Sequence, residues 1–121
     1  MLLAGTRFDD GQPGAAASLD RLSSRPDFEV VLYPAIPRDL RLSARTPPTL
    51  LLCGADDQAA ISQGVAELYL AMKRTSVPVE LHIYAGLGHG FGIRPDSVGP
   101  AAAWPQQVLD WLDARGLTKR R

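Results

Sequence analysis

Thr49-Leu50-Leu51-Leu52-Cys53-Gly54-Ala55-Asp56-Asp57 is the stretch that decides the fold. Its first five residues form a short run that is almost entirely apolar, which predicts a strand buried on both faces, and Gly54 ends that strand. Strands buried on both faces are typical of parallel sheets covered by helices on each side. The stretch therefore predicts an α/β fold in which two carboxyl groups follow the carboxyl end of a strand.

The segments on either side of this stretch continue the α/β pattern. Residues 28–33 and 79–84 read as two further strands, and the second of them alternates in polarity. A helix is predicted after Gly54, closed by Ser76 and Pro78, and another begins near Trp104. Strands that alternate with helices favour a parallel sheet, here of about three strands. The first helix places its apolar residues on one stripe: Ile61, Val65, Leu68, Tyr69 and Met72.

The length of 121 residues predicts a single domain. Residues 1–27 form a loop-rich lead-in, 28–117 hold the sheet and helices, and 118–121 are a basic tail. One short helical turn is expected within the lead-in, at residues 18–22. One or two further helical turns are expected at residues 38–44.

Composition excludes several classes of function. Thirteen basic and thirteen acidic residues balance, so no general attraction to nucleic acid or to acidic membranes is expected. No apolar run is long enough for a transmembrane helix, so a cytoplasmic location is the default, although a signal on a missing N-terminus would change it. Cys53 lies in an apolar run and is expected to be a buried small side chain, not a nucleophile.

Asp57 and His89 are the candidate catalytic residues. Each follows the end of a predicted strand, and ligands of parallel sheets bind beyond those ends. A carboxylate there accepts a hydrogen bond from an imidazole and stabilises the imidazolium that forms during proton transfer. Gly88 and Gly90 give the histidine loop conformational freedom. The alternative is that Asp57 is a helix cap and His89 a surface residue.

Several short motifs, taken in order, resemble the C-terminal part of α/β-hydrolase esterases. These esterases belong to the acetyl esterase and acetylxylan-esterase-like group, often described as dienelactone-hydrolase-like or prolyl-oligopeptidase-like. The resemblance runs from about residue 4 to residue 117 and implies a partial α/β-hydrolase fold. The motifs are Arg25-Pro26-Asp27-Phe28, Tyr33-Pro34, Pro47-Pro48-Thr49, Gly54-Ala55-Asp56-Asp57, Val77 to Tyr84, Gly88-His89-Gly90-Phe91-Gly92, Trp104-Pro105 and Trp111-Leu112.

The resemblance implies a role for each candidate residue. Asp57 corresponds to the acid of a Ser-His-Asp triad, with Asp56 as the less favoured choice, and His89 corresponds to the base. His82 is expected to be structural or partly exposed, on the strand face that also carries Glu80 and Tyr84. The implied reaction is hydrolysis of a small-molecule carboxylic ester, with acetyl groups on sugars as one candidate substrate. No metal or cofactor is implied.

One element of the family pattern is missing from the sequence. The nucleophile of such enzymes lies in a Gly-x-Ser-x-Gly turn, and none of the seven serines has that setting. We therefore expect a part of a hydrolase that is inactive alone. The alternative is a non-catalytic module that self-associates through an exposed sheet edge. A metal site from His82, His89 and the two aspartates is the weakest alternative, because no His-x-x-x-His or cysteine pair supports it.

Overall fold

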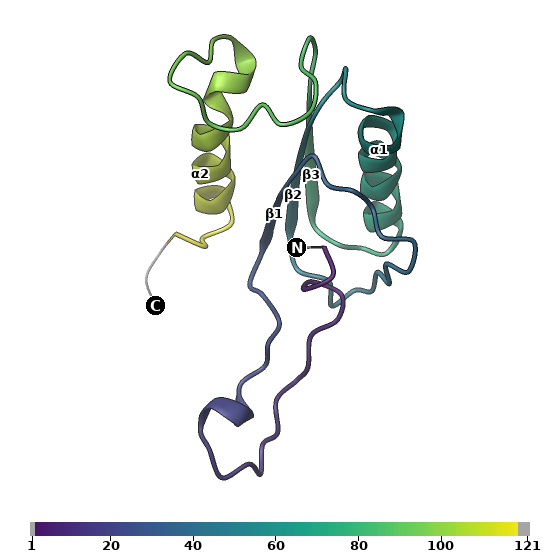
Figure 1. Ribbon diagram of the computed structural model, residues 1–121. Coiled ribbons are helices and arrows are strands. Elements are labelled where there is room, and N and C mark those ends of the chain that lie inside the picture. The colour runs from purple at the N-terminus through teal and green to yellow at the C-terminus, as the bar shows by residue number, and fades with distance from the viewer. Residues whose placement is uncertain (1, 119–121) are drawn as a thin grey trace.

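The computed structural model describes residues 2–118 and contains one sheet of three parallel strands (Figure 1). The strands are β1 (Glu29–Leu32), β2 (Thr49–Gly54) and β3 (Val79–Tyr84), in the order β1-β2-β3. The α/β class and the three parallel strands predicted from the sequence are confirmed. Because the strands are parallel, the loops that follow them emerge at the same edge of the sheet.

The central strand β2 is completely buried. Every residue from Thr49 to Gly54 is buried, because β1 and β3 pair with its two edges and helices cover both faces. Leu50, Leu51 and Leu52 have no exposed surface. Burying each of these leucines stabilises the fold by about 1.5–3 kcal/mol. This strand therefore gives the loop that follows it a rigid base.

Two helices cover opposite faces of the sheet (Figure 1). Helix α1 (Ala59–Arg74) packs with Val31, Leu51 and Cys53 in one apolar cluster, through its buried side chains. Helix α2 (Trp104–Ala114) packs with Leu50 and Leu52 on the other face, mainly through Trp111. A 3-10 turn, η2 (Pro100–Ala103), leads into α2. Within residues 2–118, no helix is long and apolar enough to cross a membrane. The buried side chains of α1 are Ile61, Val65, Leu68 and Met72.

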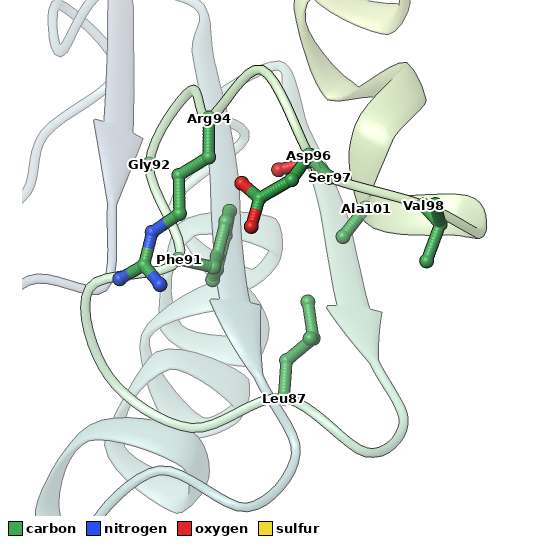
Figure 2. Close-up of a pocket in the computed structure, with 8 residues that line it drawn as sticks. All are labelled: Leu87, Phe91, Gly92, Arg94, Asp96, Ser97, Val98 and Ala101. Carbon is green, nitrogen blue, oxygen red and sulfur yellow. The ribbon is translucent and has the colours of Figure 1, made fainter.

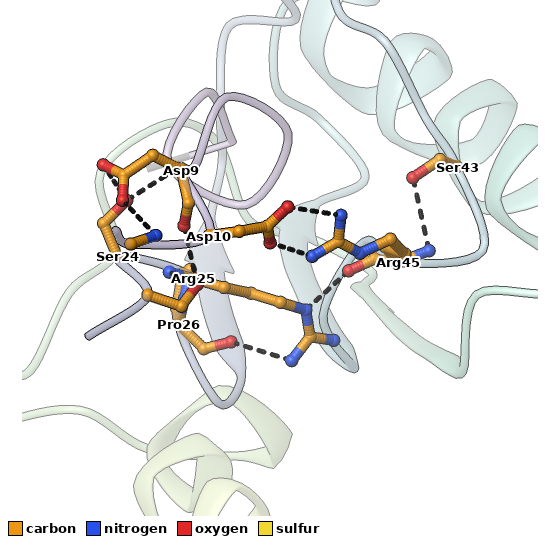
Figure 3. Close-up of polar contacts among 9 residues, drawn as sticks. Asp9, Asp10, Ser24, Arg25, Pro26, Ser43 and Arg45 are labelled. Atoms are coloured by element: carbon orange, nitrogen blue, oxygen red, sulfur yellow. Dashed lines mark hydrogen bonds and ion pairs between the residues drawn. The ribbon is translucent and has the colours of Figure 1, made fainter. Parts of the chain in front are cut away.

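The lead-in extends from the side of the sheet where β1 begins, opposite to the edge where the strands end (Figure 1). It contains the expected helical turn, η1 (Leu19–Arg21). Figure 3 shows how it is fixed: Asp10 pairs with Arg45, and Arg25 Nε donates to the Arg45 carbonyl at 2.7 Å. The aromatic ring of Phe8 lies under both guanidinium groups. These contacts attach the lead-in to the segment between β1 and β2.

One predicted element is absent. Residues 38–44 form no helix; the chain there makes isolated turns. Pro37 and the pair Pro47-Pro48 flank this segment, and an extended or turn conformation is preferred before proline. Of the predicted basic tail, residues 119–121 lie outside the described residues.

Candidate active site

The carboxylate of Asp57 is buried at the carboxyl end of β2. Its side chain has no exposed surface. Oδ1 accepts a hydrogen bond from the backbone N–H of Gln58 at 2.7 Å, and Oδ2 lies 2.9 Å from Nδ1 of His89. A buried carboxylate needs such partners, because an unpaired one would carry a large desolvation cost. Both oxygens therefore have a defined role, and one of them orients the histidine.

The loop that carries His89 reaches Asp57 by packing directly against Gly54. A Cβ built on Gly54 would lie 2.1 Å from the carbonyl oxygen of Leu87, so no larger residue fits without moving the loop. That same carbonyl oxygen accepts the N–H of Asp56 at 2.9 Å. Gly90 has a φ of 74°, which lets the chain turn immediately after His89. The close approach at Gly54 sets the separation of the two loops.

The hydrogen bond to Asp57 determines which nitrogen of His89 is free. A carboxylate accepts hydrogen bonds, so Nδ1 carries the proton and Nε2 keeps its lone pair. The side chain of His89 is 54% exposed. Within residues 2–118 its ring makes this one hydrogen bond, so Nε2 has no hydrogen-bond partner there. The arrangement presents a basic nitrogen that is held by a buried carboxylate.

An aromatic residue that the sequence did not single out contacts the histidine. The ring of Tyr33, which follows β1, meets the ring of His89 edge-on at 4.8 Å between centroids, and it meets Phe91 at 5.2 Å. Tyr33 has a φ of 37°, a strained value for a bulky residue that costs on the order of 1–3 kcal/mol. The sequence signal was the Tyr33-Pro34 pair at the strand end, but nothing in it predicted contact with His89.

The other candidates lie apart from this pair. Asp56 is exposed and takes no part in the hydrogen bond between Asp57 and His89. His82 lies on β3 with Nε2 2.8 Å from Oε1 of Glu80, and its ring stacks on Tyr84. Since the two histidines have different partners, they do not converge. Within residues 2–118 there is also no group of three or more metal-ligating side chains.

Cys53 and the serines make no hydrogen bond to the ring of His89 within residues 2–118. Cys53 is fully buried, and burial, aided by the charge of Asp57, raises the pKa of its thiol. Ser62 is near the site, but its hydroxyl lies 3.3 Å from the backbone carbonyls of Asp57 and Gln58. Within residues 2–118, no serine hydroxyl hydrogen-bonds His89. The described site therefore holds a carboxylate and an imidazole joined by a hydrogen bond.

A small pocket lies under the loop that carries His89 (Figure 2). Its volume is about 230 Å³. Leu87 and Phe91 line its apolar part, while Arg94 and Asp96 supply charged groups. Phe91 also contacts Tyr33, and Tyr33 contacts His89. Tyr33 and Phe91 therefore connect the pocket to the histidine.

Solved structures with the same arrangement of elements are esterases and related hydrolases. An acetyl ester-xyloside bifunctional hydrolase from Caldicellulosiruptor lactoaceticus is 27% identical, with a TM-score of 0.82 over 98% of this chain and 53% of its own. The carboxylesterase Cest-2923 from Lactobacillus plantarum WCFS1 is 20% identical, with a TM-score of 0.66 over 78% of this chain and 46% of its own. Esterase Est2 from Thermogutta terrifontis is 16% identical, with a TM-score of 0.71 over 94% of this chain and 50% of its own.

These likenesses agree with the sequence family. The chain spans about half the length of the solved structures it matches. No curated protein sequence matches it significantly. The sequence profile of the prolyl oligopeptidase family matches residues 23–115, most of the chain. The resemblance to α/β-hydrolase esterases predicted from the motifs is confirmed, and the chain belongs to the prolyl oligopeptidase family.

Proposed function

We propose that this chain supplies the acid and the base of a serine carboxylic-ester hydrolase, and that the serine comes from a segment outside its sequence. The observation that carries the proposal is the hydrogen bond from Nδ1 of the half-exposed His89 to the buried Asp57, which leaves Nε2 without a partner among residues 2–118. If Asp57 were only a helix cap, it would need no contact with a histidine. If His89 were only a surface residue, it would need no buried carboxylate as a partner.

In this proposal His89 moves protons and Asp57 orients it. Nε2 takes the proton of the serine hydroxyl as the serine oxygen attacks the ester carbonyl carbon. The imidazolium then gives that proton to the departing alcohol, leaving an acyl-serine. Nε2 next takes a proton from water, whose oxygen attacks the acyl carbon, and the imidazolium returns that proton to the serine oxygen as the acid is released. Asp57 stays ionised and stabilises the imidazolium at each stage.

The absence of a Gly-x-Ser-x-Gly turn in the sequence sets the expected activity of the chain alone. Loss of a triad nucleophile costs on the order of 10⁶ in kcat, and loss of one oxyanion donor costs about 10²–10³. A histidine and aspartate without these groups are a weak general base. We therefore infer that the chain by itself has no esterase activity above the His89→Ala background.

Short-acyl esters are the proposed substrates, with acetyl esters of sugars as the first class to test. The support is the acetyl ester-xyloside hydrolase, which is 27% identical over 98% of this chain. A pocket lined by Leu87 and Phe91, on the loop that carries His89, is small and combines an apolar wall with charged groups, which suits a compact ester carrying a polar alcohol.

The test is hydrolysis of a p-nitrophenyl acetate series by the purified chain, compared with His89→Ala and with His82→Ala as the matched control. We expect all three proteins to match the buffer rate. A burst of p-nitrophenol from the wild-type chain that disappears in His89→Ala would mean that one of its own serines is the nucleophile. That result would contradict the proposal that the serine lies elsewhere.

A second candidate function is a module that associates through β1. Within the described residues, β1 pairs with β2 along one edge, and no strand covers the other edge. Val31, Leu32 and Pro34 border an open groove beside it. An unpaired edge of this kind invites association. Sedimentation equilibrium separates the alternatives: the module predicts a stable dimer in which His89→Ala has no effect, whereas a monomer over a wide concentration range argues against it.

A further inference from the structure

We propose that Tyr33 is a positioning residue, which fixes the plane of the His89 imidazole so that Nε2 points to a constant place. The inference rests on the proposed function, because it concerns the base of that reaction. It rests on geometry that the family match does not provide: an edge-on ring contact at 4.8 Å and a strained backbone at the residue that makes it.

The hydrogen bond to Asp57 cannot by itself fix the histidine. A ring bonded through one nitrogen can still rotate about the bond axis, which moves the opposite nitrogen. Gly88 and Gly90 flank His89, so neighbouring side chains give no local restraint. More than half of the side chain is exposed. A second contact is needed, and the ring of Tyr33 is the aromatic group that the structure places against the imidazole.

Tyr33 is itself held in place by two contacts. Its backbone N–H donates to the carbonyl oxygen of Leu52 on β2 at 2.6 Å, which continues the pairing of the two strands. Its ring also meets the ring of Phe91, which contacts Tyr84 on β3. The aromatic support of His89 therefore extends from β1 to β3. Edge-on pairs of this kind are favourable and directional.

The backbone conformation of Tyr33 supports the same conclusion. A positive φ is rare for a bulky residue, and the residue before a proline normally prefers extended conformations. The chain accepts this strain, and the result is a tyrosine ring directed at His89. Strain of this sort persists where the surrounding structure requires it, often at functional sites.

The first measurement is NMR of the His89 ring in the purified chain. We expect nuclear Overhauser contacts between the ring protons of His89 and those of Tyr33, and ring-current shifts of the His89 signals. Tyr33→Leu should remove those shifts and broaden the signals, whereas Tyr33→Phe should retain them. Phe28→Leu is the matched control, since Phe28 lies just before the start of β1 and packs on Trp111.

The second measurement is kinetic and uses the chain combined with its serine-bearing segment. Tyr33→Leu should lower kcat by about 10- to 100-fold with little change in KM, because a displaced base loses orientation and not substrate binding. Tyr33→Phe should restore the rate. Absence of the wild-type contacts, or His89 signals that are the same in Tyr33→Leu, overturns the proposal. Intact contacts without any esterase activity would overturn the proposed function instead.

Discussion

Gly54→Ala tests how the two loops of the site are spaced. A Cβ at this position would lie 2.1 Å from the carbonyl oxygen of Leu87 and 2.7 Å from that of Gly88. Both atoms belong to the backbone, so no flexible side chain can absorb the clash. The loop must retreat by roughly 1 Å to restore an ordinary contact. If the loop moves directly away, the separation of His89 and Asp57, now 2.9 Å, becomes roughly 3.9 Å, which is too long for a hydrogen bond.

The cost of Gly54→Ala has two parts. Overpacking destabilises a protein by about 1–3 kcal/mol, and the same movement weakens the hydrogen bond from Asp56 to Leu87. With a urea m-value of about 1–3 kcal/mol per M, the unfolding midpoint should fall by on the order of 1 M. In the combined enzyme, a displacement of about 1 Å should lower kcat by up to roughly 100-fold.

Urea unfolding followed by circular dichroism measures the effect on stability. Gly14→Ala is the matched control, because a Cβ there meets nothing within 4 Å. Its free energy of unfolding should stay within about 0.5 kcal/mol of the wild-type value. If Gly54→Ala unfolds at the same urea concentration as Gly14→Ala, the close packing of the histidine loop on β2 is refuted.

Four further changes test other parts of the account. Asp57→Asn should lower kcat of the combined enzyme by roughly 10⁴ because the wrong tautomer of the base is favoured, while His82→Ala leaves kcat unchanged, as steady-state kinetics will show. Trp111→Ala should cost about 3–5 kcal/mol by emptying the core under α2, read as a lower urea midpoint; an unchanged midpoint would be inconsistent with its burial. Burial raises the pKa of Glu29, so its contribution to stability is full below its ordinary pKa and is lost as pH rises through the folded value. As pH rises above the ordinary glutamate pKa of 4.5, Glu29→Gln should therefore lose less stability than wild type in urea titrations, and equal losses would argue against this carboxyl. Cys53 should react with a thiol reagent more slowly in the folded chain than in urea, since it is fully buried and its pKa is raised; equal rates would contradict that burial.

The elements that local pattern alone determines were predictable from the sequence. The apolar run of β2 and the stripe of α1 bury their residues as expected, because few other structures satisfy those patterns. The position of Asp57 after β2 followed from the same run. The chain order of two parallel strands joined by a helix then placed His89 at the same edge of the sheet.

Contacts between distant segments were not predictable. The role of Gly54 depends on how closely a loop more than thirty residues later approaches it, which no local pattern records. The contact of Tyr33 with His89 depends on a backbone angle that propensity would reject. Residues 38–44 were predicted to be helical from composition, but the surrounding prolines favoured turns. Sequence reasoning singled out Asp57 and His89, and the structure places their side chains in hydrogen-bond contact.

The most direct test of the central claim is to measure the p-nitrophenol burst after the chain is combined with a segment that carries the Gly-x-Ser-x-Gly turn. That segment would be looked for in frame, in the DNA upstream of this sequence. Our account predicts no burst from either part alone, a burst proportional to the amount of complex, and none when the chain carries His89→Ala. A burst that survives His89→Ala, or that the chain gives by itself, would contradict the assignment of Asp57 and His89 as the acid and base of a serine held elsewhere.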